Sequence, residues 1–177
     1  QGGELYSRVH PRGKVHGLEN GTARFYAGCV AVGLSYLHSL DILYRDLKPE
    51  NVLIDSTGYA KICDMGFSKV VPIGSKTYTL CGTVEYLAPE LLVGRGHNRG
   101  VDWWAFGVLI YEMIAGLTPF EDPQRKEEPT MRNILRKELQ FPQKPQFDKG
   151  AEDLISNLLL RNLLEVMFRL VTLNHYS

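Results

Sequence analysis

The fold of this chain is best predicted from one stretch, Tyr44-Arg45-Asp46-Leu47-Lys48-Pro49-Glu50-Asn51. It places a carboxylate, an ammonium group and a carboxamide close together, and Pro49 stiffens the loop between them. Asp46 can accept the hydrogen of a hydroxyl, Lys48 can neutralise charge on a transferring phosphoryl group, and Asn51 can ligate Mg²⁺ through its carbonyl oxygen. These residues therefore predict a site that presents a hydroxyl to a metal-bound triphosphate.

Size and composition exclude several classes of protein. The 177 residues are enough for one compact domain with a sizeable core. Twenty Lys and Arg balance twenty Asp and Glu, which argues against a general nucleic-acid or membrane-surface binder. The three cysteines form no CxxC pair, so we expect a reducing intracellular compartment, the cytoplasm.

No apolar segment is long enough to span a membrane and no signal peptide is visible. Because the first residue is Gln1, we expect the chain to begin inside a longer reading frame.

A long helix is predicted upstream of the octapeptide. A turn at 2–3 leads into a short helix ending near 11–13, and a stronger helix is expected from about 22 to 39, capped by Thr22. The residues expected on its buried face recur at steps of three and four: Phe25, Cys29, Val32 and Tyr36.

Downstream, the pattern predicts one hairpin, a long loop and three helices. Two short apolar runs at 52–54 and 60–63 are typical of a β-hairpin. Residues 66–99 are rich in Gly and Pro and are expected to form a functional loop with a short helix around Glu90. Beyond a surface loop at 122–130, helices are expected at 101–116, which is apolar nearly all round and therefore central, at 131–139 and at 150–161.

Three further motifs follow the octapeptide: Asp64-Met65-Gly66, Ala88-Pro89-Glu90 and Asp102-Trp103-Trp104. Together the four motifs resemble those of eukaryotic protein kinases. The segment 77–87 is similar to the activation loop of the cyclic-nucleotide-dependent and related kinases, the AGC group. Met65 stands where the family has Phe, and Val84 stands where it usually has Pro.

The resemblance implies a protein kinase-like fold, mainly α-helical with a small β-hairpin at the active site. It covers residues 1–162, as the large C-terminal lobe only, because the chain contains no Gly-x-Gly-x-x-Gly loop and no Val-Ala-x-Lys strand. The implied activity is ATP-dependent phosphorylation of protein Ser or Thr, weak or absent in this chain alone. The alternative is a non-catalytic, pseudokinase-like lobe that binds peptides or partner proteins. Residues 163–177 are expected to be an atypical tail.

The same resemblance assigns catalysis to Asp46 and Lys48. It assigns binding of the cofactors, ATP and Mg²⁺, to Glu4, Glu50, Asn51, Leu53 and Asp64, with Asn51 and Asp64 as the metal ligands. Glu4 would reach the ribose and Leu53 would touch adenine, although Leu53 could equally be a core residue.

Substrate binding is assigned to five residues: Glu4, Glu50, Glu112, Thr83 and Val84. The three acids would pair with basic residues before the phosphoacceptor, although each could simply be a solvated carboxylate. Thr83, expected to hydrogen-bond near Asp46 and Lys48, would favour Ser or Thr substrates. The implied partners are protein substrates with Ser or Thr near basic residues, a regulatory cyclic-nucleotide-binding subunit or domain, and an activating kinase; neither nucleic acid nor membrane is expected.

Regulation and support complete the assignments. Thr79 matches the activating phosphorylation site, whose phosphate would pair with Arg45; the alternative is an unmodified hydroxyl. Asp102 is expected to be structural and to accept N–H groups of the catalytic loop. In the family, the Arg of a Pro-x-x-Arg-x-Gly pattern pairs with the Glu of Ala-Pro-Glu. The Pro and Arg positions of that pattern hold Leu163 and Val166 here, and Arg169 comes three residues late, so Glu90 is expected to lack its Arg partner. An unpaired, buried Glu90 would cost about 3–5 kcal/mol.

Overall fold

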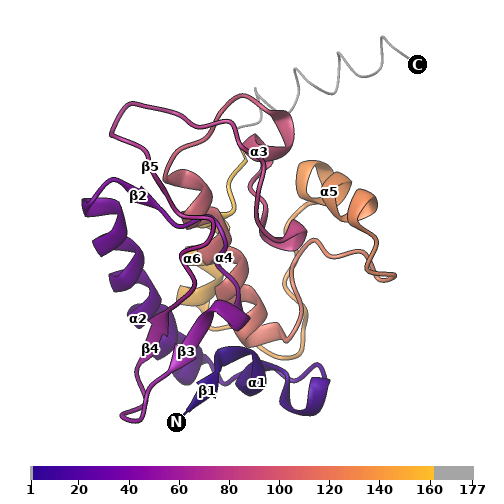
Figure 1. Cartoon of the computed structure of the whole chain (residues 1–177). Helices are drawn as coiled ribbons and strands as arrows, with labels where there is room; N and C mark the ends of the chain where they lie inside the picture. Colours follow the sequence, from indigo (N-terminus) through magenta and orange to yellow (C-terminus); the bar gives the residue numbers. More distant parts are fainter. Residues whose placement is uncertain (1, 162–177) are drawn as a thin grey trace.

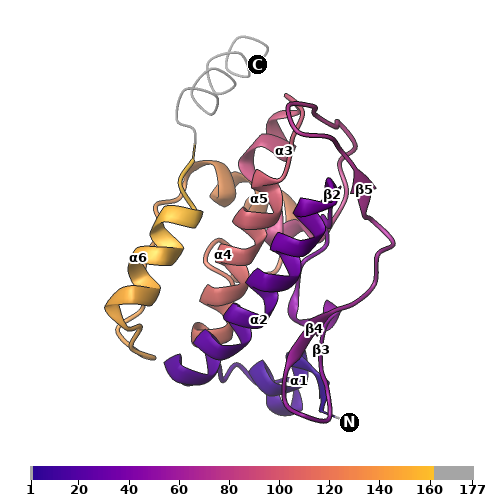
Figure 2. The same cartoon turned by 90° about the vertical axis from the view of Figure 1, so that its left-hand side faces the viewer.

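The computed structural model describes residues 2–161 and is built around one buried helix, α4 (Gly100–Ala115). Every residue of α4 from 101 to 115 except Trp103 is buried. It packs against α2 (Asn20–Ser39) and α6 (Lys149–Leu158), which run alongside it in Figures 1 and 2. At Gly107 the approach of α6 is so close that an added Cβ would lie 2.9 Å from Leu158 Cβ. The prediction of a central helix at this position is confirmed.

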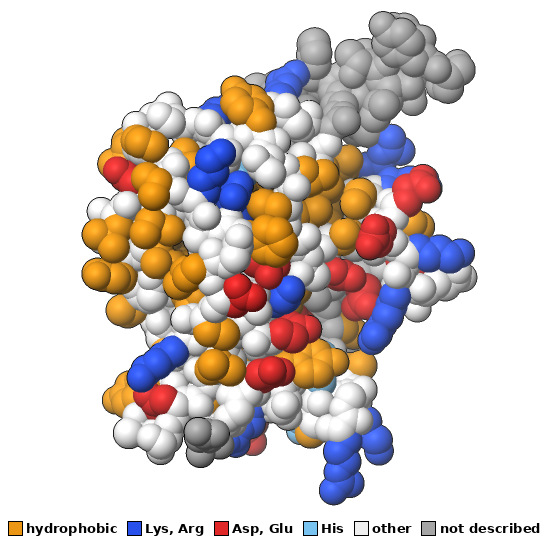
Figure 3. Space-filling model, in the orientation of Figure 1, with side chains coloured by type: hydrophobic (Ala, Val, Ile, Leu, Met, Phe, Trp, Pro, Cys, Tyr) orange, Lys and Arg blue, Asp and Glu red, His pale blue; other side chains and the backbone are white. Residues whose placement is uncertain are grey.

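The buried face expected for α2 is wrong at three of its four residues, while Cys29 is half-buried and packs against the core. Phe25, Val32 and Tyr36 are 46%, 72% and 65% exposed. Figure 3 shows hydrophobic side chains on the surface over this helix. The residues that are buried instead lie on a neighbouring stripe: Ala23, Ala27, Val30, Leu34 and His38. Both stripes are apolar, and the one that begins with two alanines lets the helix approach its neighbours closely. Periodicity alone cannot choose between two apolar stripes.

A three-stranded sheet lies at the N-terminal end of the molecule (Figure 1), with the strand order β1 (Gly3–Glu4), β3 (Val52–Ile54), β4 (Ala60–Ile62). All pairs are antiparallel, and β3 and β4 form the hairpin predicted from the sequence. The pairing of β1 was not predicted, because a two-residue strand leaves no periodic signal. A second, two-stranded sheet pairs β2 (Ile42–Leu43) with β5 (Lys69–Val70) and so joins the octapeptide to the segment after Asp64.

Shorter elements complete the described chain. They are α1 (Leu5–Val9), α3 (Pro89–Val93), α5 (Glu127–Arg136) and the 3₁₀ turns η1 (Pro11–Gly13), η2 (Pro49–Asn51) and η3 (Val84–Tyr86). Helix α5 begins earlier than predicted, inside the expected surface loop, because proline is tolerated in the first turn of a helix and Pro129 lies there.

Within residues 2–161 no helix is both long and apolar enough to cross a membrane. The expectations for Leu163, Val166, Arg169 and the tail 163–177 concern positions outside the described residues.

Candidate active site

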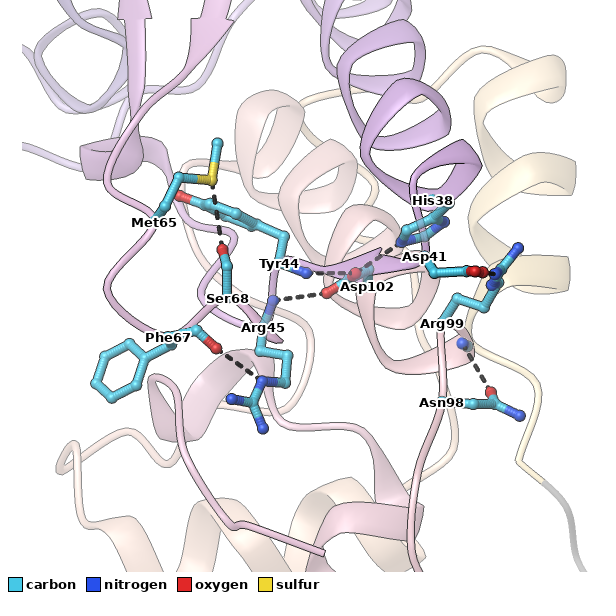
Figure 4. Close-up of polar contacts among 11 residues, drawn as sticks. His38, Asp41, Tyr44, Arg45, Met65, Phe67, Ser68, Asn98, Arg99 and Asp102 are labelled. Atoms are coloured by element: carbon cyan, nitrogen blue, oxygen red, sulfur yellow. Dashed lines mark hydrogen bonds and ion pairs between the residues drawn. The ribbon is translucent and has the colours of Figure 1, made fainter. Parts of the chain in front are cut away.

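The backbone of the octapeptide is held by Asp102, a fully buried residue in the first turn of α4. Its Oδ1 accepts the Arg45 N–H at 2.8 Å, and its Oδ2 accepts the Tyr44 N–H at 2.9 Å. His38 Nε2, from the end of α2, lies 2.7 Å from the same Oδ2 (Figure 4). The carboxylate thereby fixes a loop in which Arg45 has a φ of 70°, a conformation that costs a non-glycine residue about 1–3 kcal/mol.

Asp46 lies at the centre of a polar network. Its Oδ2 accepts the Asn51 Nδ2 group at 2.8 Å and lies 3.2 Å from Lys48 Nζ. Lys48 donates to Thr83 Oγ1 at 3.0 Å, and that hydroxyl lies 3.2 Å from Asp46 Oδ1. Asp46 is buried, while the Lys48 side chain is partly exposed. The network fixes a buried carboxylate beside a partly exposed ammonium group.

Asn51 and Asp64 provide oxygens for a metal ion. Both hydrogen bonds of Asn51 Nδ2 go to Asp46, one to its backbone carbonyl oxygen and one to its carboxylate, so the side-chain oxygen Oδ1 of Asn51 remains available as a ligand. Asp64 is exposed, and its Oδ1 accepts the Gly66 N–H at 2.9 Å. The Cys63 N–H donates to the backbone carbonyl oxygen of Asn51 at 2.9 Å, which ties the two segments together.

This oxygen donor set fits Mg²⁺, which is usually held by one or two protein oxygens while water and phosphate oxygens fill its other positions. No cluster of three or more His, Cys, Asp or Glu side chains suited to a metal occurs in residues 2–161. A metal held by Asn51 and Asp64 would take its other ligands from water or phosphate oxygens. Tyr44, whose hydroxyl donates to the Cys63 carbonyl oxygen, stays neutral beside these acids because burial raises its pKa.

The residues expected to contact the nucleotide base and ribose lie on the small sheet. Glu4 of β1 pairs with Leu53 of β3 in the antiparallel register, and both side chains are exposed. Glu4 and Leu53, the two residues predicted to contact the nucleotide, are 49 positions apart in the sequence but neighbours in the sheet. Glu4 does not line the cavity that contains the other two predicted substrate acids.

That cavity has a volume of about 790 Å³ and contains Glu50, Thr83 and Glu112 in its wall. In Figure 3 a band of acidic side chains crosses this face towards α5. Burial is the main cause that raises the pKa of Glu112, and the charges of Glu50 and Glu121 add to it, while a hydrogen bond from His10 opposes the rise. Val84 begins η3 beside Thr83 but is not part of the cavity wall.

Two contacts of Glu112 were not predicted from the sequence. His10 Nε2 lies 2.7 Å from Glu112 Oε1, and the Tyr86 hydroxyl donates to Oε2. The cavity wall also contains Glu85 and Glu121. No motif or spacing in the sequence brings these residues together, since they are contributed by separate segments that meet only in the folded chain.

The segment that contains Thr79 lies against the loop before α4. The Thr77 N–H donates to the His97 carbonyl oxygen, and the His97 N–H donates to the Thr77 carbonyl oxygen in return. Thr79 itself is exposed. Arg45 donates through Nε to the Phe67 carbonyl oxygen at 2.8 Å (Figure 4). Glu90 is half-buried and has an interaction partner, so the expected cost of an unpaired buried carboxylate at this position was wrong.

Comparison with known proteins agrees with this geometry. The family model described as protein kinase domain matches residues 1–165. The chain is 51% identical over 165 residues, 93% of its length, to cAMP-dependent protein kinase type 3 of Saccharomyces cerevisiae. It is 47% identical over 158 residues, 89% of its length, to the cAMP-dependent protein kinase catalytic subunit of Dictyostelium discoideum. It is also 46% identical over 161 residues, 90% of its length, to the serine/threonine-protein kinase gad8 of Schizosaccharomyces pombe. The chain spans 39%, 23% and 27% of the length of these relatives.

Proposed function

The chain belongs to the protein kinase domain family, and on that premise we propose that its parent protein transfers the γ-phosphoryl group of ATP to Ser or Thr of protein substrates. The observation that supports this most directly is the contact between Asp46, Lys48 and Thr83, with Asn51 bonded to the same carboxylate. The names of the relatives, which include cAMP-dependent and serine/threonine-protein kinases, point the same way.

Each residue of the network has a role in this proposal. Asp46 orients the substrate hydroxyl and accepts its hydrogen, and Lys48 stabilises the charge of the transferring phosphoryl group. Asn51 and Asp64 would hold Mg²⁺, which when bound neutralises the phosphate oxygens. Glu4 and Leu53 would contact the ribose and the adenine. Thr83 keeps the Asp46 carboxylate beside Lys48, and Val84 would contact the residue after the phosphoacceptor.

We propose that the substrates carry basic residues before the phosphoacceptor. Glu50 and Glu112 face the same cavity, and Glu50 is exposed and ready to bind a guanidinium group. An acid on an otherwise apolar helix needs a polar partner, which Glu112 has in this cavity. Glu4 would add a third carboxylate from the nucleotide side.

We further propose that residues 1–162 form the large lobe of the kinase domain, located in the cytoplasm. A glycine-rich loop and a lysine for the α- and β-phosphates would have to come from outside these 177 residues, so the chain alone would have little activity. A cyclic-nucleotide-binding subunit or domain and an activating kinase would regulate the parent protein. The competing proposal is a non-catalytic lobe that binds peptides or partners, and the absence of those two motifs from the chain is what favours it.

The test restores the upstream half of the domain from the Saccharomyces cerevisiae relative and measures transfer from Mg-ATP to a Ser peptide with preceding arginines. Asp46→Ala should abolish transfer, a loss of about 10²–10⁴-fold or more, without unfolding the protein. Asp153→Asn, an exposed acid of α6, is the control and should leave the rate unchanged.

Transfer that survives Asp46→Ala would refute the assignment of Asp46. A fused protein that folds and binds the peptide but never transfers phosphate would instead support the non-catalytic lobe. Turnover by the 177-residue chain alone, at the rate of the fused protein, would overturn the proposal that it needs an upstream lobe.

A further inference from the structure

The ring of His10 lies against Glu112, in the wall of the cavity that contains the acids proposed to bind basic substrates. His10 Nε2 is 2.7 Å from Glu112 Oε1, and the Tyr86 hydroxyl donates to Oε2. Both carboxylate oxygens therefore already have a partner from the chain itself. A guanidinium group from a substrate has to share this carboxylate with His10, because a bidentate pair uses both oxygens.

The folded chain fixes the backbone on both sides of His10. His10 caps the C-terminal end of α1, where its N–H donates to the Tyr6 carbonyl oxygen at 2.8 Å, and its ring lies against the Tyr6 ring with centroids 4.7 Å apart. The segment that follows is attached to the end of α4, since the Leu18 N–H donates to the Met113 carbonyl oxygen at 2.6 Å. The imidazole is thus held beside the helix that carries Glu112.

The contact between His10 and Glu112 can persist when the charge of the ring changes. An ionised carboxylate can only accept, so His10 Nε2 carries a hydrogen both in the neutral imidazole and in the imidazolium form. The bond can stay in place while the pair changes from one negative charge to none. The His10 side chain is 12% exposed, so it can exchange protons with water, and histidine is the side chain that changes charge between about pH 5 and 8.

The other charged groups that face Glu112 are acids. Burial is the main cause that raises the pKa of Glu112, and the charges of Glu50 on η2 and of Glu121 after α4 add to the rise, while His10 opposes it. Arg125 pairs with Glu121 at 3.1 Å, but its side chain is 79% exposed, so water and salt screen its charge. Within residues 2–161, His10 is therefore the group that can place a positive charge in contact with this carboxylate.

The elements packed against α1 add no second charge beside the His10 ring. These elements are β1, β3, η1, η2 and α4. Glu4 of β1 and Arg12 of η1 are exposed to water, β3 carries no charged residue, and Asp102 lies at the opposite end of α4 from Glu112. The charge of the ring is thus felt mainly by Glu112.

We propose that His10 sets the affinity of the Glu112 carboxylate for a basic side chain of the substrate, and that it does so through its charge. As an imidazolium it neutralises Glu112 and repels an approaching guanidinium group, whereas as a neutral imidazole it leaves the negative charge of Glu112 available. Binding of arginine and protonation of His10 therefore oppose each other, so the affinity for basic substrates rises with pH. The inference rests on the proposed function, which places substrate arginines beside Glu50 and Glu112, and it adds His10 as a specificity-determining residue.

The test measures, by NMR titration between about pH 5.5 and 8, how tightly the 177-residue chain binds a Ser peptide with two arginines before the serine. The control peptide carries citrulline, a neutral analogue of arginine, at both positions. The affinity for the arginine peptide should rise about five- to tenfold over this range, because one positive charge is removed near the guanidinium group. The affinity for the citrulline peptide should not change.

Three variants separate the charge of His10 from its position. His10→Gln keeps a neutral N–H donor and should have the higher affinity for the arginine peptide at every pH. His10→Arg keeps a permanent positive charge and should have the lower affinity at every pH. His16→Gln removes an exposed histidine that is not part of the cavity wall, and it should leave the pH dependence unchanged. A loss of folding cannot imitate this result, because it would lower the affinity in both His10 variants.

The outcomes separate this inference from the proposed function. If the chain binds the arginine and citrulline peptides equally at pH 8, the acids of the cavity do not bind basic side chains, and the proposed substrate preference fails together with the role of His10. If arginine is preferred but the preference does not change with pH, or if the same rise with pH persists in His10→Gln, only the role of His10 is overturned. In the fused protein the change should appear in KM and not in kcat, and a change in kcat alone would count against His10 as well.

Discussion

Replacing Asp102 with Asn should lower the free energy of unfolding by about 2–4 kcal/mol. The two carboxylate oxygens of Asp102 contact three nitrogens: the backbone N–H groups of Tyr44 and Arg45, and His38 Nε2, which must donate because an ionised carboxylate can only accept. An asparagine offers one acceptor oxygen. In its better orientation that oxygen keeps Tyr44 and His38, and the amide NH₂ then faces the Arg45 N–H with no acceptor between them.

The magnitude follows from these contacts. Leaving the buried Arg45 N–H without an acceptor costs about 1–3 kcal/mol. Changing the two remaining bonds from charge-assisted to neutral removes about 1 kcal/mol more. The sum is a large fraction of the stability of an ordinary domain, about 5–15 kcal/mol.

Urea unfolding followed by tryptophan fluorescence measures this directly, because Trp103 lies against His38 with ring centroids 5.5 Å apart. Asp153→Asn is the matched control: it is exposed, and its backbone carbonyl rather than its carboxylate accepts the Asn157 side chain, so a change within about 0.5 kcal/mol is expected. A loss below about 1 kcal/mol for Asp102→Asn would refute the reasoning, because the loop would then be held by something other than this carboxylate.

Two further predictions concern Gly82 and Glu112. Gly82 has a φ of 106°, and an added Cβ would lie 2.8 Å from the Arg45 carbonyl oxygen, whereas Gly58 has a φ of 93° and open space around it. In urea unfolding, Gly82→Ala should therefore cost about 1–3 kcal/mol more than Gly58→Ala, and equal costs would show that the clash is relieved. The folded-state pKa of Glu112 is raised, mainly by burial, so its stabilising contribution is present below the unfolded value of about 4.3 and is lost as pH rises through the folded pKa. Glu112→Gln should accordingly gain stability relative to the unmodified chain as pH rises above about 4.3, and a difference that stays constant with pH would contradict the burial argument.

The sequence predicted the parts of the fold that have strong local signals. Helix α4 is apolar nearly all round, which is the pattern of a central helix, and the β3–β4 hairpin has two apolar runs around a glycine turn. The face of α2 could not be predicted in the same way, because both of its stripes are apolar and the helical period does not show which one packs against the neighbouring elements. Whether Ala27 is buried and Tyr36 is exposed depends on the neighbouring elements, and the helical period carries no information about them.

In the candidate site, too, some residues could be predicted from the sequence and others could not. The octapeptide and Asp64 are marked by motif spacing, so their assignments could be made from the sequence, and the structure brings Asp46, Lys48 and Thr83 into contact. The partners of those residues could not be identified. His10 lies 102 positions from Glu112, and its contact with that acid depends on the packing of α1 and η1 beside α4. A lone histidine in a polar segment has no feature that distinguishes a solvent-facing ring from one that fixes a carboxylate.

Arg45 connects the catalytic loop to the segment that contains Thr79 and Thr83. Its backbone N–H is bound by Asp102, its Nε by the Phe67 carbonyl oxygen, and its own carbonyl oxygen lies against Gly82, one residue before Thr83. The strained φ of 70° persists because these contacts over-determine it, and the next residue along the chain is Asp46. Any ligand that binds the free end of the Arg45 guanidinium therefore acts on a residue that contacts both the catalytic loop and the segment containing Thr83. A phosphate on Thr79 would stabilise the arrangement of Asp46 and Thr83 through this one side chain, without any movement of α4, because Asp102 already holds the loop from below.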